Sequence, residues 1–254
     1  MEQHIDKNCC CCGPDNNQNC IICGKTLIYF QEEKMLECRI CHKFKPANAC
    51  CEDGHFVCDD CHVGGGAPIL DYLLCSKEKD PIALYIQVCN LSAVHLHGPE
   101  HHSIVPCVLM TTYHNCGGDI EFEECLQEAW ARGRKVPGGA CGFLGVCGAA
   151  AGAGIFASIV SEASPLTEKE WEIPQRLTAN CLNAMVKVGG PRCCKRTGRI
   201  AIECAAKYSE EVFGVRMSYT TPKCTFSARN KECLHQRCPF FNPEEQETGG
   251  TADS

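Results

Sequence analysis

Apolar residues in the middle of the chain repeat with the three-to-four-residue spacing of amphipathic helices. The first such stretch follows Asp80 and Pro81, which are typical of an N-cap and a first helical position. The same spacing predicts further helices from Pro99 to about Cys116, over Ile120–Arg132, from Pro174 to Val188 and behind Pro191. The pattern therefore predicts a mainly α-helical domain.

The stretch Gly138–Gly154 differs from these helices because it contains seven glycines and lies in a run without charge from Val136 to Ser161. It is long enough for a membrane span, but glycine at this density is a poor helix former and only weakly apolar. It lacks the GxGxxG spacing of a dinucleotide loop. We expect Phe143–Val160 to be a central helix whose small residues let another backbone or a cofactor approach closely.

The composition is unusual in its cysteine content, with 26 cysteines in 254 residues. The first residues, MEQHIDKN, contain no apolar segment, so we expect no signal peptide and a cytoplasmic location. In the cytoplasm, cysteines more often bind metal ions or iron–sulfur clusters than form disulfides. The net charge of −7 argues against generic binding to nucleic acid or to anionic membranes.

The cysteines and the polar segments suggest five regions. Residues 1–19, with the run Cys9–Cys12, and residues 244–254 are expected to be disordered tails. Residues 20–62 form a Cys/His module, residues 63–216 the helical core domain, and residues 217–243 a cysteine-rich loop that packs on the core. Gly64–Gly66 is expected to be a hinge or a close-packed turn between the module and the core.

The module has four pairs of metal-ligand residues, enough for two structural zinc ions: Cys20 and Cys23, Cys38 and Cys41, Cys51 and His55, and Cys58 and Cys61. A cross-brace would join the first pair with the third and the second with the fourth. A sequential arrangement fits the spacing equally well. A segment this short has too little apolar core to fold without metal.

The sequence HGPEHH at His97–His102 concentrates three imidazoles and a carboxylate in six residues. Its His97, Glu100 and His101 match the HxxEH of inverted zincin peptidases, which makes a zinc-dependent hydrolase one alternative. Gly98 and Pro99 favour a helix that begins here instead. In that interpretation Glu100, His101 and His102 are catalytic residues at the mouth of a helix, and His97 is a metal ligand.

A second chemical block, GGPRCCKR, begins at Gly189. If Pro191 is the first helical residue, Cys193 and Cys194 lie in the first turn beside cationic side chains. The helix dipole and these charges favour a thiolate, which can act as a nucleophile, a sulfur carrier or a cluster ligand.

The last cysteines lie in an irregular segment and include a Cys–Pro pair typical of the end of an iron–sulfur loop. We expect Cys224, Cys233 and Cys238, with Cys193 or Cys194, to ligate a cluster of the 4Fe–4S type. Two cysteines of the glycine-rich stretch are the reserve ligands: Cys141 and Cys147. The loop has few apolar residues, so a cluster would also order it.

Together the blocks HGPEHH, VPGGACGFLGVCGAAAGAGIF and GGPRCCKR and the final cysteine loop resemble one family over about residues 20–242. It is an uncharacterised, cysteine-rich domain-of-unknown-function family of methanogenic archaea and anaerobic bacteria. The resemblance implies a metal-dependent role in anaerobes, with a radical S-adenosylmethionine or methyltransferase enzyme as partner. The leading hypothesis is an iron–sulfur protein of sulfur transfer, redox chemistry or cofactor maturation. The runner-up is a metal-stabilised scaffold that binds a partner enzyme and has no chemistry of its own.

Overall fold

The computed structural model describes residues 20, 22–23, 25–62, 66–91 and 93–246. The expectations for Cys9–Cys12, for most of the two tails and for Gly64 and Gly65 lie outside these residues. Within them the chain forms two strands and nine α-helices. The prediction of a mainly α-helical protein with an N-terminal Cys/His cluster is confirmed.

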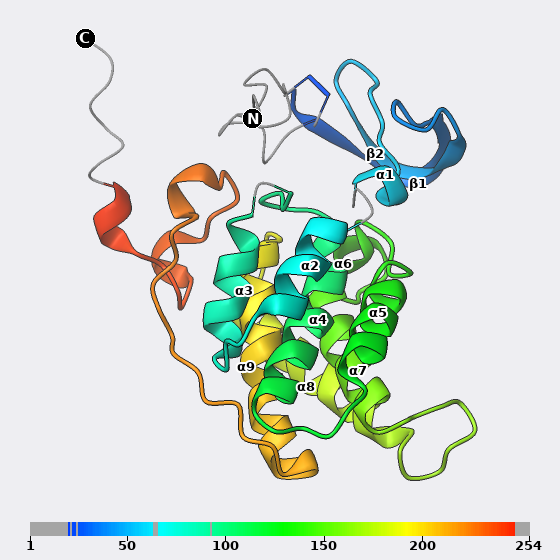
Figure 1. Cartoon of the computed structure of the whole chain (residues 1–254). Coiled ribbons are helices and arrows are strands. Elements are labelled where there is room, and N and C mark those ends of the chain that lie inside the picture. The colour runs from blue at the N-terminus through cyan, green and yellow to red at the C-terminus, as the bar shows by residue number, and fades with distance from the viewer. Residues whose placement is uncertain (1–19, 21, 24, 63–65, 92, 247–254) are drawn as a thin grey trace, which may run out of the picture.

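The Cys/His module is a β-hairpin followed by one helical turn, and it lies at one end of the helical bundle (Figure 1). Strands β1 (Leu27–Glu37) and β2 (Phe44–Cys51) pair antiparallel, with a bulge between Tyr29 and Lys34. The short helix α1 (Asp59–His62) then leads toward the bundle. The sequence pattern did not predict these strands, because metal-ligand spacing dominates the segment.

The helical bundle is built from eight helices: α2 (Ala67–Cys75), α3 (Pro81–Cys89), α4 (Glu100–Asn115), α5 (Phe122–Gly133), α6 (Ala140–Phe143), α7 (Gly148–Val160), α8 (Glu172–Val188) and α9 (Cys194–Phe213). As predicted, the Asp80 carboxylate caps α3, accepting hydrogen bonds from the N–H groups of Ile82 and Ala83. None of the helices in this described part of the chain is long and apolar enough to cross a membrane.

Helices α4 and α7 form the centre of the bundle, and both pack against α5 and α9. A Cβ atom at Gly148 would lie 2.0 Å from the His102 ring, and one at Gly152 would lie 2.8 Å from Cδ of Pro106. These glycines let α7 contact α4 at a distance that no larger residue allows. The close approach expected of the glycine-rich helix is therefore present.

Helices α4 and α5 begin one and two residues later than predicted, and α7, α8 and α9 also begin at other positions. Helix α7 starts at Gly148 and not at Phe143, because Gly145 takes a left-handed conformation (φ 70°) that interrupts the chain after α6. Helix α8 begins at Glu172, so Pro174 lies within its first turn. Helix α9 begins at Cys194 and not at Pro191, because Cys193 is extended (φ −153°, ψ 104°) and serves as the N-cap.

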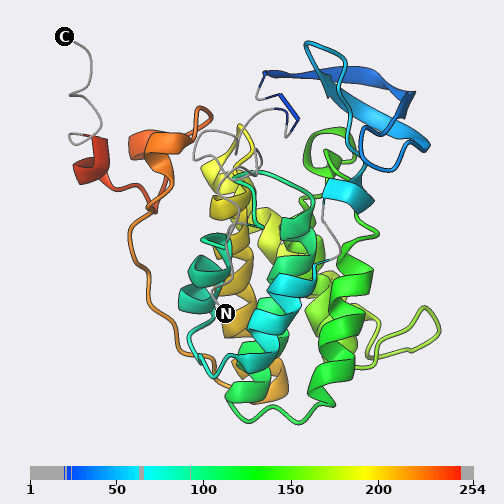
Figure 2. The ribbon, with the colours of Figure 1, turned by 45° about the horizontal axis from the view of Figure 1, so that its top comes forward.

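Beyond α9 the chain returns along the bundle to the end that carries the Cys/His module (Figures 1 and 2). It contains three short 3-10 helices: η1 (Ser227–Arg229), η2 (His235–Arg237) and η3 (Pro243–Gln246). Five apolar side chains of this loop are buried: Met217, Phe226, Leu234, Phe240 and Phe241. The expectation that the loop has too few apolar residues to order itself is wrong, since these side chains anchor it to the bundle.

Candidate metal centres

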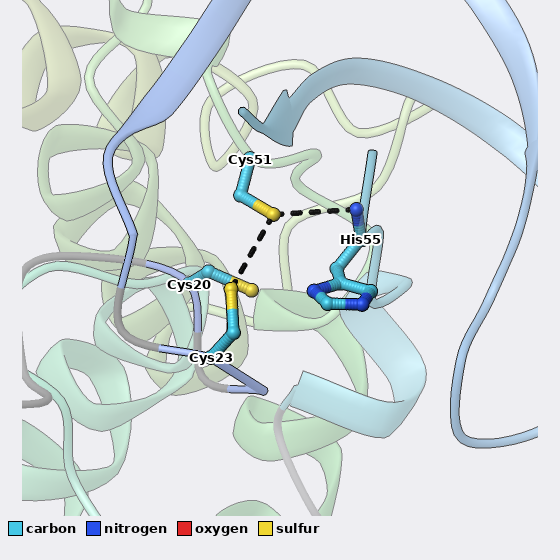
Figure 3. A group of neighbouring side chains, drawn as sticks. All are labelled: Cys20, Cys23, Cys51 and His55. Carbon is cyan, nitrogen blue, oxygen red and sulfur yellow. Dashed lines mark hydrogen bonds between the residues drawn. The ribbon is translucent and has the colours of Figure 1, made fainter. Parts of the chain in front are cut away.

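The first candidate centre brings together Cys20, Cys23, Cys51 and His55, and their side chains point toward one another (Figure 3). All four ligand atoms lie within 4.8 Å of one another. The hairpin positions the set, because β1 begins just after Cys23 and the pairing of Leu27 with Cys51 brings the end of β2 beside it.

The second centre joins Cys38, Cys41, Cys58 and Cys61, again with all ligand atoms within 4.8 Å. The Sγ atoms of Cys41 and Cys58 are 3.8 Å apart, and those of Cys23 and Cys51 in the first centre are 3.7 Å apart. Thiolates at about 2.3 Å from a tetrahedral zinc ion are separated by about 3.8 Å. Both groups therefore fit zinc, in the cross-brace arrangement and not the sequential one.

Backbone N–H groups point at several of these sulfurs. The N–H of Ile22 donates to Cys20 Sγ (3.4 Å) and that of Ile40 to Cys38 Sγ (3.5 Å), two residues after the cysteine in each case. Burial opposes ionisation of Cys38, but the N–H groups around it outweigh burial and lower the pKa of that thiol to about 6. At Cys38 this environment stabilises a thiolate, the form that binds metal, whereas at Cys20 burial prevails and raises the pKa to about 11.

A cavity of about 410 Å³ lies between the module and the bundle. Its walls include residues of HGPEHH (His97 and His102), of GGPRCCKR (Arg192 and Cys194) and of the glycine-rich stretch (Cys141). Burial raises the pKa of both Cys141 and Cys194, and Cys147, at the N-cap of α7, is close enough to add to this effect. This cavity is large enough for a small-molecule substrate.

The residues of HGPEHH separate into different environments. His97 is bonded at both ring nitrogens: Nδ1 accepts the N–H of Cys194 (3.4 Å), and Nε2 lies 3.1 Å from Asn230 Oδ1. His102 Nδ1 donates to the carbonyl of Val136 (2.9 Å), and burial lowers the pKa of its ring, which favours the neutral form.

His101 is buried among polar partners. Its Nδ1 lies 3.2 Å from the hydroxyl of Tyr85, which donates to the carbonyl of Cys194 (3.0 Å). Its Nε2 lies 3.2 Å from the Nζ of Lys195, a buried lysine that also donates to the carbonyl of His95 (2.8 Å). Among the described residues, neither His97 nor His101 belongs to a metal-ligand group. The HxxEH interpretation therefore finds no zinc site at this pair.

Glu100, by contrast, lies with two histidines that the sequence did not group with it, His62 and His95. No role was assigned from the sequence to His62 or to His95. The only available signal for His95 was its position two residues before His97, which extends the histidine block at its N-terminal side.

The vicinal cysteines also separate. Cys193 lines a second cavity together with three cysteines of the C-terminal loop: Cys224, Cys233 and Cys238. Cys194 faces the larger cavity instead, and burial raises the pKa of its thiol to about 12. The expectation of a thiolate at Cys193 and Cys194 is therefore not met in this environment, because burial raises the pKa of both thiols and outweighs the nearby Arg196 and Arg192.

The fold and these sites define a cysteine-rich helical protein with an N-terminal module that can bind metal. The model of a family of unknown function, DUF5714, matches residues 69–241, and the chain belongs to this family. The match begins after the Cys/His module, whereas the resemblance noted in the sequence extended back to about residue 20. No curated protein and no solved structure matches the chain.

Proposed function

We propose that this protein is a zinc-stabilised iron–sulfur protein of redox metabolism. One observation carries the proposal: Cys193 from the start of α9 and three cysteines of the C-terminal loop line the same cavity. The other three are Cys224, Cys233 and Cys238. Four thiolates are the usual ligand set of a 4Fe–4S cluster, which supplies one-electron chemistry when it is bound.

The hydrogen bonds at these sulfurs support the proposal. The N–H of Phe226 donates to Cys224 Sγ and that of His235 to Cys233 Sγ, both at 3.4 Å. In both cases the donor lies two residues after the cysteine. The same contact occurs at Cys20 and Cys38 in the two tetrads of the Cys/His module. The side-chain amide of Asn230 donates to Cys193 Sγ (3.4 Å). Such bonds stabilise the negative charge of cluster-bound sulfur.

Charge and burial around the cavity fit the same group. Lys195, Arg196 and Arg199 line the cavity and offset the negative charge of four thiolates. Arg199 also stacks over the Phe240 ring (3.9 Å), and Lys195 lies over the Phe226 ring (5.1 Å). These contacts tie the loop to α9, so the ligands from both segments are held in place before a cluster binds.

Within the three roles that the sequence left open, redox chemistry is supported best. Four cysteine ligands occupy every iron of such a cluster, and Cys193 is buried, which suits electron transfer more than release of sulfur. Cys194, the next residue, faces the cavity that can hold a substrate. We extend the proposal to the partner: a radical S-adenosylmethionine or methyltransferase enzyme that exchanges electrons with this site.

Anaerobic reconstitution with ferrous iron and sulfide tests the proposal. Wild-type protein is expected to bind both and to develop the broad visible absorption of a cluster. Single serine variants of the four cysteines should lose it, whereas Cys75→Ser, at an exposed cysteine outside the cavity, should not. If all five variants and the wild type bind no iron with sulfide, the scaffold hypothesis takes the place of this proposal.

A further inference from the structure

We infer that His62, His95 and Glu100 form a third metal centre, a mononuclear site for a divalent transition metal ion. The site lies where the Cys/His module meets the helical bundle. His62 belongs to α1 of the module, His95 to the segment before α4, and Glu100 is the first residue of α4. This centre uses no ligand of the proposed cluster and does not depend on it.

The geometry brings one ligand atom from each residue within 4.8 Å of the other two. The imidazole rings of His62 and His95 have their centroids 4.5 Å apart. The N–H of His95 donates to Glu100 Oε1 (2.9 Å), which fixes the carboxylate beside the two rings. The neighbouring Cys61 is one of the second tetrad, so zinc in the module would hold His62 in position.

Two buried atoms of the group lack a hydrogen-bond partner. Glu100 is 1% exposed, and its Oε2 makes no hydrogen bond. His62 Nδ1, 3.5 Å from that oxygen, makes none either. Unsatisfied buried polar atoms are rare in folded proteins, and each carries a desolvation cost. A metal ion between them would satisfy both.

A glycine makes room for the carboxylate. A Cβ atom at Gly98 would lie 2.0 Å from Glu100 Oε2 and 2.6 Å from the carboxyl carbon. The backbone at Gly98 does not have a positive φ, so it is space, not chain conformation, that calls for glycine here. Because Gly98 has no side chain, the Glu100 carboxylate can occupy this space.

Two histidines and one carboxylate are a ligand set of catalytic zinc and of non-haem iron(II), and they leave coordination positions open. His62 and His95 line the 410 Å³ cavity, so those positions would face it. Arg192 lines the same cavity and supplies a positive charge. The site would take a metal ion with water or an oxygen atom of an anionic substrate in its open positions.

Zinc counting on the full-length protein tests the inference. After equilibrium dialysis with zinc, the wild type is expected to hold three ions per chain, and His95→Ala and Glu100→Gln are expected to hold two. His114→Ala removes a histidine that stacks on Phe122 away from the site, and it should keep three. Circular dichroism identifies any variant that fails to fold.

Glu100→Gln separates a metal site from a purely structural contact. Glutamine retains the shape of the side chain and an oxygen that accepts the His95 N–H, but it is a poor metal ligand. A wild type that holds only two ions, or a folded Glu100→Gln protein that still holds three, would overturn the inference. Iron and sulfide are counted in the same samples, so failure of the cluster proposal is seen separately.

Discussion

Cys193 and Cys194 are adjacent in the chain, but their side chains line two different cavities. Cys193 is extended and faces the three cysteines of the C-terminal loop. Cys194 begins α9 and faces the cavity between the module and the bundle. The start of α9 therefore connects the proposed cluster site with the cavity between the module and the bundle.

This separation predicts opposite results for two serine variants. Cys193→Ser removes a cluster ligand and should abolish binding of iron and sulfide. Cys194→Ser changes the neighbouring residue and should leave the iron content unchanged, because the Cys194 side chain does not line the cavity that contains Cys193 and the three loop cysteines. Iron and sulfide analysis after anaerobic reconstitution checks both, and equal loss in the two variants would contradict the assignment of the ligands.

In the Cys/His module a second pair of adjacent cysteines gives a matched comparison. Cys51 belongs to the first tetrad, whereas Cys50 is in neither tetrad. Cys51→Ser should lower the zinc content by one ion per chain and destabilise the hairpin, because metal binding contributes to folding here. Cys50→Ser should keep its zinc. Native mass spectrometry gives the counts, and zinc loss from the Cys50 variant alone would refute the pairing.

Contact between α4 and α7 can be tested at a glycine. Gly148→Ala places a Cβ atom 2.0 Å from the His102 ring, so it should destabilise the protein by about 1–3 kcal/mol. Gly142→Ala is the control, because no atom lies within 4 Å of its added Cβ. Chemical denaturation followed by circular dichroism measures both. Equal stability of the two variants would argue against this packing.

Glu203 on α9 predicts a pH dependence that does not involve metal. Burial raises the pKa of its carboxyl group, and the nearby cations Arg199 and Lys207 only partly oppose this effect. A raised native pKa means that Glu203 disfavours folding above that pKa and ceases to do so below its unfolded value of about 4.3.

Glu203→Gln should therefore have a higher melting temperature than wild type at pH 7, and the difference should shrink as the pH falls toward 4. Thermal unfolding of the two proteins at matched pH values checks this. A difference that is constant with pH, or that grows as the pH falls, would show that the carboxylate is not the cause.

The sequence was most informative where local spacing determines geometry. The CxxC pairs and the Cys51–His55 pair indicated all four ligand pairs, because two ligands three or four residues apart reach one ion within a single turn. The choice of the cross-brace came only from the hairpin, which brings Cys23 beside Cys51. The mainly helical fold followed from apolar periodicity, although α9 begins at Cys194 and not at Pro191.

Several features that depend on distant segments were not predicted. His95 and His62 are 33 positions apart in the chain, and only the docking of the module on the bundle brings them to Glu100. The high pKa of Cys194 also depends on burial by other segments. Its cationic neighbours in the sequence instead suggested a lowered pKa. The anchoring of the C-terminal loop was not predicted because its five buried apolar residues are scattered along the sequence without a period.

Spectroscopy of wild-type protein purified without oxygen tests the central claim most directly. The claim is that Cys193, Cys224, Cys233 and Cys238 hold one 4Fe–4S cluster, so we expect about four iron and four sulfide ions per chain. Mössbauer spectra should show a single cluster type, and reduction should produce the paramagnetic resonance signal of a one-electron-reduced cluster. Protein that contains zinc but neither iron nor sulfide would contradict the account.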